Sequence, residues 1–135
     1  MISFGQESFA ELKVRNTWVR SAPPNSQIFS GYLDFKNITS DKIIIKKIQS
    51  NAFEKIEIHS SSIEDGISSM RKADTLEIPA HSEVKLQPGG YHLMLMNPKK
   101  AIKENNPIEL MIYYEAEERT KILRLDAIVL RNGYE

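Results

Sequence analysis

Short segments of alternating hydrophobic and polar residues, separated by turn residues, run along most of this chain. Leu12, Val14 and Trp18 alternate with polar neighbours, which is typical of a half-buried β-strand. The run Ile43-Ile44-Ile45 consists of β-branched residues, which favour a strand over a helix. On these grounds we predict strands in nine segments: 12–18, 29–35, 43–48, 56–59, 76–78, 84–86, 91–96, 108–114 and 121–130.

The spacing of these segments predicts the fold class. Turn signals recur at intervals of roughly 8–12 residues, which is typical of a sandwich or barrel, and helical spacing is convincing nowhere. We therefore predict an all-β fold of about nine short strands. A length of 135 residues is typical of one domain. We expect a single domain over residues 1–135, in which residues 1–10 form an irregular N-terminal segment.

Charge and hydropathy narrow the range of partners. The chain has 18 basic and 18 acidic residues, a balance that does not favour nucleic acid, which binds clustered Lys and Arg. No apolar run approaches the roughly 20 residues needed to cross a bilayer, so we expect no membrane span. Residues 1–10 lack the long apolar stretch of a secretory signal. Composition is compatible both with a cytosolic protein and with a mature or truncated form of an exported one.

Several kinds of chemistry are excluded or lack their motifs. The chain has no cysteine, which excludes disulfides, thiolate zinc sites, cysteine nucleophiles and blue-copper centres. A glycine-rich phosphate loop, a His-Glu-x-x-His motif and a Gly-x-Ser-x-Gly elbow are missing. The carboxylates of Glu117 and Glu118 fall in an expected hairpin loop, where solvated charge is the ordinary interpretation. We therefore expect a protein that is not an enzyme.

The histidines and methionines concentrate between His59 and Met96. In the expected strand 91–96, His92, Met94 and Met96 alternate with Tyr91, Leu93 and Leu95, so each set occupies one face. If the second set faces the core, the histidine and both methionines point away from it. Three further residues complete the picture: His59 points away from its strand's inward pair, Met70 is expected in a loop after Gly66, and His81 resembles a turn residue.

These side chains suit copper. A thioether is a soft, neutral ligand that binds Cu(I), and imidazole binds copper generally. Residues two apart on a strand have α-carbons roughly 6.5–7 Å apart, a separation that His and Met side chains can bridge to one ion. The alternative is structural, since methionine commonly fills gaps in hydrophobic cores. Alternation alone leaves both interpretations open for Met94 and Met96.

The spacing of four residues resembles the copper-binding signature of the PCu(A)C family of copper chaperones. Ten residues separate His59 from Met70, twenty-one separate Met70 from His92, and one separates His92 from Met94. Other segments of the chain are similar to family sequence as well: 18–20, 22–24, 64–66, 78–81 and 86–96.

The resemblance implies a cupredoxin-like Greek-key β-sandwich in bacteria, outside the cytoplasmic membrane. It implies that His59, Met70, His92 and Met94 bind Cu(I), and that the protein delivers copper to the Cu(A) centre of cytochrome c oxidase. The expected partner is then a copper-accepting oxidase subunit or another copper carrier, with the protein itself a monomer in the periplasm.

Two departures from the family pattern limit the resemblance. Some relatives have an extra methionine after the first histidine, but Ser60, Ser61 and Ser62 follow His59 here. Some carry a His- and Met-rich C-terminal extension, whereas residues 131–135 contain neither residue type. We therefore expect one Cu(I) ion, with Met96 a neighbour and not a ligand. A copper buffer or resistance protein without a dedicated acceptor, and a metal-free sandwich that serves as an interaction module, remain alternatives.

Overall fold

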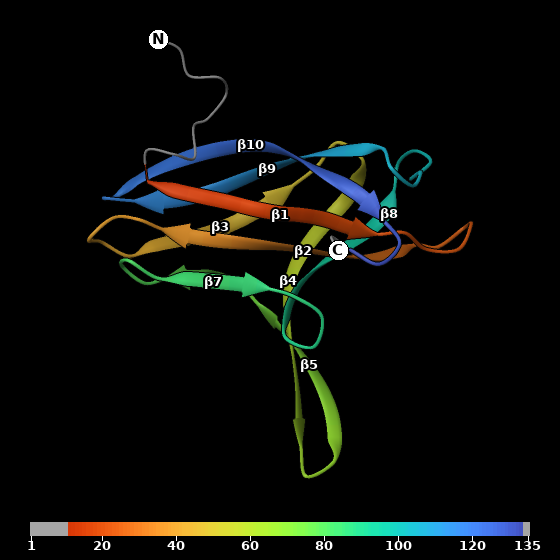
Figure 1. The fold of residues 1–135 in the computed structure, drawn as a ribbon, viewed down its shortest axis with the longest axis horizontal. Helices are drawn as coiled ribbons and strands as arrows, with labels where there is room; N and C mark the ends of the chain where they lie inside the picture. The colour runs from red at the N-terminus through yellow and green to blue at the C-terminus, as the bar shows by residue number, and fades with distance from the viewer. Residues whose placement is uncertain (1–10, 134–135) are drawn as a thin grey trace.

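The computed structural model describes residues 11–133, which form ten β-strands and no helix (Figure 1). Within this range no helix could therefore span a membrane. The expected irregular segment 1–10 lies outside the described residues. The strands are β1 (Leu12–Arg20), β2 (Ile28–Asn37), β3 (Ile43–Gln49), β4 (Phe53–Glu64), β5 (Ile67–Ala73), β6 (Leu76–Ile78), β7 (Glu83–Leu86), β8 (Tyr91–Pro98), β9 (Pro107–Ala116) and β10 (Arg119–Leu130).

All ten strands belong to one hydrogen-bonded sheet that folds over a single core. The order is β5-β4-β8-β2-β1-β10-β9-β3-β6, and β7 pairs with β2 beside this path. The first and last strands, β1 and β10, pair in parallel, whereas the other pairs are antiparallel. The sheet can close over one core because its inward positions alternate with outward ones. The inward side chains include Leu33, Phe35, Ile45, Leu95 and Leu110, all fully or almost fully buried.

The all-β prediction is confirmed, and each of the nine predicted segments lies in a strand. The tenth strand, β5, was not predicted, and the expectation that Met70 lies in a loop is wrong. Six of the seven residues of β5 are exposed, so the strand shows none of the alternation that a half-buried strand imposes on its sequence. It forms because Asp65 and Gly66 make a tight turn with φ of 52° and 79°, the left-handed geometry of two-residue hairpin loops.

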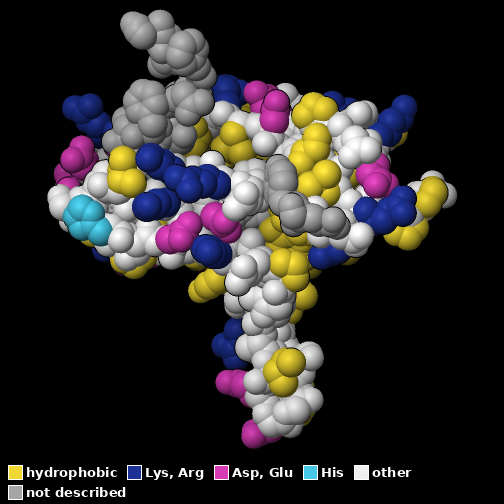
Figure 2. Space-filling model, in the orientation of Figure 1, with side chains coloured by type: hydrophobic (Ala, Val, Ile, Leu, Met, Phe, Trp, Pro, Cys, Tyr) yellow, Lys and Arg dark blue, Asp and Glu magenta, His cyan; other side chains and the backbone are white. Residues whose placement is uncertain are grey.

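The hairpin of β4 and β5 projects from the body of the molecule (Figure 1). Its register pairs His59 with Lys72 and Ser61 with Met70. Most side chains on the hairpin are polar, with hydrophobic ones exposed among them (Figure 2). Ile63, Ile67 and Met70 are 74%, 69% and 52% exposed. Since β5 is at the edge of the sheet, the hairpin is held to the body mainly through β4.

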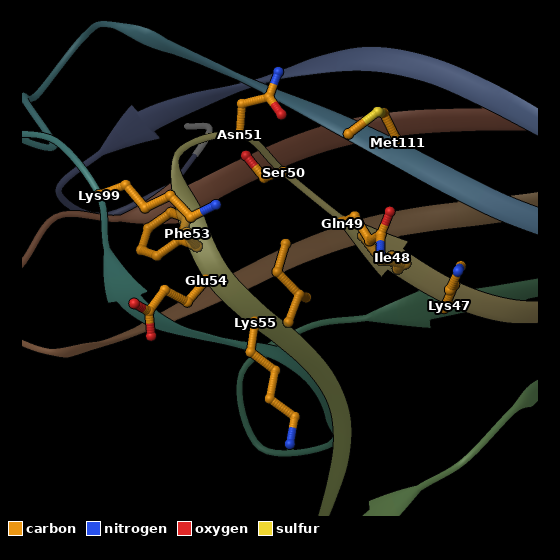
Figure 3. Close-up of a pocket in the computed structure, with 11 residues that line it drawn as sticks. Lys47, Ile48, Gln49, Ser50, Asn51, Phe53, Glu54, Lys55, Lys99 and Met111 are labelled. Carbon is orange, nitrogen blue, oxygen red and sulfur yellow. The ribbon is translucent and has the colours of Figure 1, made fainter.

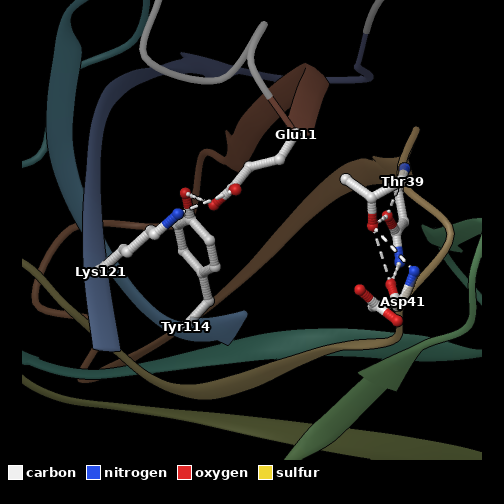
Figure 4. A network of polar contacts seen from close by, with 6 residues as sticks. Glu11, Thr39, Asp41, Tyr114 and Lys121 are labelled. Atoms are coloured by element: carbon white, nitrogen blue, oxygen red, sulfur yellow. Dashed lines mark hydrogen bonds and ion pairs between the residues drawn. The ribbon is translucent and has the colours of Figure 1, made fainter. Parts of the chain in front are cut away.

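A buried asparagine at the end of β2 is hydrogen-bonded to the loop that follows β2 and to the end of β6. The side-chain amide of Asn37, which is fully buried, donates to the backbone oxygens of Asp41, Ile78 and Pro79 at 2.8, 2.9 and 3.1 Å. Its carbonyl oxygen accepts from the backbone N–H and the hydroxyl of Thr39 at 2.9 and 2.8 Å (Figure 4). The motif Asn37-Ile38-Thr39 therefore serves the fold, and its amide is inaccessible to glycosylation in the folded protein.

A second polar network fixes the start of β1 (Figure 4). The carboxylate of Glu11 accepts hydrogen bonds from the Tyr114 hydroxyl at 2.8 Å and from Lys121 Nζ at 2.9 Å. Although burial opposes ionisation, these hydrogen bonds outweigh it and hold the pKa of Glu11 below its ordinary value. Burial and the adjacent carboxylate raise the pKa of Tyr114 well above its ordinary value. The network joins the beginning of the chain's first strand to β9 and β10.

Replacing Asn37 by Ala should lower the free energy of unfolding by about 2–4 kcal/mol, because the backbone oxygens of Ile78 and Pro79 and the backbone N–H of Thr39 lose their side-chain hydrogen bonds. Urea denaturation measures the change. Asn51→Ala, in an exposed turn, is the matched control and should stay within about 0.5 kcal/mol of the parent protein. Equal effects of the two substitutions would contradict the role assigned to Asn37.

The turn between β9 and β10 contains two glutamates in a conformation that does not suit them. Ala116 pairs with Arg119, and Glu117 and Glu118 between them have φ of 54° and 63°. A two-residue turn with both φ values positive is of type I′, which Asn-Gly fits best. A residue with a Cβ pays roughly 1–2 kcal/mol for this conformation.

Glu117→Asn combined with Glu118→Gly should therefore raise the free energy of unfolding by about 1–2 kcal/mol. Thermal and urea denaturation together provide the measurement. Glu118→Val should act in the opposite direction, because a β-branched side chain is least tolerant of positive φ. A stabilising effect of Glu118→Val would show that backbone strain in this turn does not lower the free energy of unfolding.

Candidate metal centre

The four predicted ligands lie on one face of the strands β5, β4 and β8. His59 of β4 pairs directly with His92 of β8, and residues opposite each other in an antiparallel pair point to the same side. Met94 shares this face because it follows His92 by two positions. Met70 of β5 pairs with Ser61, two positions beyond His59, and so also shares it. The opposite face of β4 and β8 presents Ile58 and Leu93 to the core.

The two imidazoles form the centre of this arrangement. Their ring centroids are 5.8 Å apart with a tilt of 36°. A metal ion lies roughly 3.2 Å from the centroid of an imidazole that it binds at about 2 Å, so rings at this separation can share one ion. His92 is 8% exposed and the His59 side chain 13%. The pair is therefore sheltered from water although it points away from the hydrophobic core.

A neighbouring carboxylate selects the tautomer of the neutral His59 ring. His59 Nε2 lies 2.9 Å from Glu57 Oε1, and because an ionised carboxylate only accepts hydrogen bonds, Nε2 carries the proton. In the neutral ring the lone pair is then on Nδ1. This atom is buried and has no hydrogen-bond partner, an arrangement that costs free energy in a folded protein unless something binds there. A metal ion would satisfy it.

His92 has a similar outer partner. Its Nδ1 lies 3.3 Å from the backbone oxygen of Gly90, which can only accept, so Nδ1–H donates and Nε2 retains the lone pair. Histidines that bind metals commonly donate their other ring N–H to a carboxylate or a backbone carbonyl in this way, which fixes the tautomer and the ring orientation. Both histidines thus have the outer hydrogen bonds expected of metal ligands.

The two methionines occupy different positions relative to the histidines. Met94 is half-buried and lies directly opposite Glu57, one step along the strand from the histidine pair. Met70 is 52% exposed on the projecting hairpin, diagonal to His59 across the β4–β5 pair. The structure thus brings His59, His92 and Met94 together as neighbours and places Met70 at the outer border of the same face.

Of the six positions in the alternation predicted for β8, four agree with it, whereas Tyr91 is exposed and His92, on the outward face, is buried. Leu93 and Leu95 are buried in the core, and Met94 and Met96 on the other face are half-buried. Tyr91, grouped with the two leucines by its position, is the first residue of the strand and is 39% exposed. His81 is an exposed turn residue with φ of 55°, as expected.

Glu57 also lies on this face, opposite Met94, and was not among the residues predicted to form the site. Its carboxylate binds three groups: His59 Nε2 at 2.9 Å, Lys55 Nζ at 3.0 Å and Lys72 Nζ at 3.5 Å. The hydrogen bonds from His59 and Lys55 lower the pKa of Glu57 to about 2, so it is ionised at neutral pH. The signal in the sequence was the spacing of Lys55, Glu57 and His59, which puts all three on one face of a strand.

A metal site in the described chain would need the methionines as well as the histidines. Within residues 11–133 no group of three or more His, Asp or Glu side chains is arranged to hold a metal ion. A concave region between β3, β4 and β9 is bordered by Lys47, Lys55, Lys99 and Met111 (Figure 3). None of the four predicted ligands borders that region. Met111, which borders it, is half-buried.

Solved structures with the same fold include copper-bound and Cu(I)-bound proteins. The copper-bound PCuAC domain from PmoF2 is similar with a TM-score of 0.73 and 19% identity, covering 89% of this chain and 92% of that one. The Cu(I) form of DR1885 from Deinococcus radiodurans is similar with a TM-score of 0.71 and 20% identity, covering 95% and 83%. These likenesses show the cupredoxin-like β-sandwich expected from the sequence.

Sequence comparison establishes the family. "Putative lipoprotein Lxx21020" from Leifsonia xyli subsp. xyli is 29% identical over 104 residues, which cover 76% of this chain. The matched region spans about 61% of that protein's length. The family model described as "Putative lipoprotein LpqE-like" matches residues 12–123, nearly all of the described strands. The chain therefore belongs to the LpqE-like family, which is the PCu(A)C family that the spacing of its histidines and methionines resembles.

Proposed function

We propose that this protein is a copper chaperone that binds one Cu(I) ion through His59, Met70, His92 and Met94. The observation that supports this most directly is the buried, unpartnered Nδ1 of His59, which lies in a ring 5.8 Å from that of His92. A structural histidine in a half-buried position would be expected to use both nitrogens. The copper-bound relatives with the same fold support the choice of ion.

The donor set explains why the ion would be Cu(I). Two imidazoles and two thioethers are neutral, and thioethers prefer soft monovalent copper, whereas Cu(II) prefers nitrogen and oxygen donors. The outer hydrogen bonds to Glu57 and Gly90 hold the imidazoles in the tautomers that present a lone pair. Neither thioether has a proton to lose, so binding through sulfur needs no deprotonation.

The position of Met70 suggests how the ion would be released. His59, His92 and Met94 lie where β4 pairs with β8, whereas Met70 is exposed on the outer strand of the projecting hairpin. Of the four donors Met70 is the one that an acceptor's side chains can replace first, because it is the most exposed and the least constrained by neighbours. The sheltered histidine pair would then release the ion last.

We infer that the acceptor is the Cu(A) centre of cytochrome c oxidase and that transfer takes place outside the cytoplasmic membrane, in the periplasm. The resemblance to the PCu(A)C family supports the acceptor, and the lipoprotein names of the family model and of the relative from Leifsonia support the location. A copper buffer with the same site but no dedicated acceptor is the alternative that a transfer experiment distinguishes.

Competition for Cu(I) with a chromophoric chelator tests the ligand set. His59→Ala, His92→Ala, Met70→Leu and Met94→Leu should each weaken Cu(I) affinity by a factor of about ten or more, since each removes one donor. Met70→Leu and Met94→Leu should change the melting temperature little, because Leu and Met have similar volumes.

Met111→Leu, Met96→Leu and His81→Ala are the matched controls for this titration. They remove the same residue types outside the proposed ligand set, and their Cu(I) affinity should stay within about threefold of the parent protein. A uniform loss across ligand and control variants, or loss of folding in Met94→Leu, would show that the methionines serve packing.

Transfer of Cu(I) to a purified, copper-free Cu(A) domain tests the chaperone function separately. We expect the Cu(I)-loaded protein to reconstitute the domain's characteristic visible absorption under reducing conditions followed by controlled oxidation, and to do so faster than an equal concentration of chelator-bound Cu(I). Tight Cu(I) binding without transfer would favour the buffer.

A further inference from the structure

The methionines of the described chain differ in their exposure to solvent. Met70 is 52% exposed, whereas Met94, Met96 and Met111 are half-buried. Six of the seven residues of β5, Met70 among them, are exposed, and β5 is at the edge of the sheet. Because small oxidants reach a side chain through the same openings as water, Met70 is the methionine among these four that they meet most readily.

The neighbours of Met70 leave its side chain accessible. It lies opposite Ser61 and two positions from Ser68 on the same face, and both of these side chains are short. It also borders a shallow concave region of the hairpin, which is lined by Ser61, Ser62, Ile63, Ser68, Ser69, Met70 and Gly89. Because the hairpin projects from the body (Figure 1), an enzyme as well as a small molecule can approach this face.

Oxidation would remove Met70 as a soft donor and leave the core undisturbed. When hydrogen peroxide oxidises a thioether, the O–O bond breaks, an S–O bond forms, the sulfur loses two electrons and the peroxide is reduced to water. The resulting sulfoxide is polar and lacks the soft thioether character that suits Cu(I). Since Met70 does not belong to the hydrophobic core cluster, the added oxygen should leave the fold intact.

We propose that Met70 is a reversible redox switch of the copper site, at which a peroxide oxidises the thioether to the sulfoxide and a methionine sulfoxide reductase restores it. In the reverse step the thiols of the reductase are oxidised to a disulfide, and the sulfoxide oxygen leaves as water. This inference rests on the proposed Cu(I) site and adds its regulation. In the oxidised state His59, His92 and Met94 remain as donors, so the protein binds Cu(I) more weakly and releases it more readily.

Peptide mapping by mass spectrometry, after brief treatment of the copper-free protein with hydrogen peroxide, identifies the oxidised residues. We expect Met70 to gain one oxygen at least about fivefold faster than Met94, Met96 or Met111. The protein oxidised at Met70 should bind Cu(I) about tenfold or more weakly in the chelator competition, with its melting temperature nearly unchanged. The two reductases that act on the two sulfoxide epimers should together restore the parent affinity.

Two leucine variants separate the switch from general oxidative damage. Met111→Leu retains Met70, so peroxide should weaken its Cu(I) binding as it does in the parent protein. Met70→Leu lacks the oxidisable donor, so the same treatment should change its already weaker Cu(I) affinity by less than about threefold. Oxidation of Met94 before Met70, or a sulfoxide at Met70 that leaves Cu(I) affinity unchanged, would overturn the switch alone. Failure of the untreated protein to bind Cu(I) would overturn the proposed function and the switch with it.

Discussion

The register between β4 and β8 is the constraint on which the candidate site depends. Ile58 pairs with Leu93 and His59 with His92, so one face of the pair belongs to the core and the other holds the imidazoles. A slip of one residue would exchange these faces and put both histidines among buried aliphatic side chains. The core that fixes the fold therefore also fixes the distance between the two rings.

Around this pair the two methionines proposed as donors differ in how firmly they are held. Met94 belongs to the same strand as His92, whereas Met70 lies on a hairpin that contacts the body mainly through β4. Glu57 links the histidine pair to the outer strand of the hairpin, because it contacts His59 on its own strand and Lys72 on β5. The site thus combines a sheltered centre with an exposed border, an arrangement that suits an ion which is bound for a time and then given up.

Much of the fold and of the candidate site could be predicted from the sequence. The same physical reasons explain which features could not be predicted. Alternation predicted β8 and grouped Met94 with His92 on one face, since a strand with one buried face must repeat every two residues, but it left open whether Met94 packs in the core. β5 has no buried face, and so its sequence contained no such pattern and Met70 was assigned to a loop. The contact between Glu57 and Lys72 was not predictable, because it depends on how β4 and β5 are aligned. The ligand set itself is a prediction from family resemblance that the structure makes geometrically reasonable.

The coordination of the ion is the most direct test of the account. X-ray absorption spectroscopy on the Cu(I)-loaded protein would count the nitrogen and sulfur atoms bound to copper. We expect two nitrogen and two sulfur scatterers, with one sulfur lost in Met70→Leu and the other in Met94→Leu. A shell of nitrogen and oxygen alone, unchanged by either substitution, would contradict the proposal that this face of the sheet is a soft copper site.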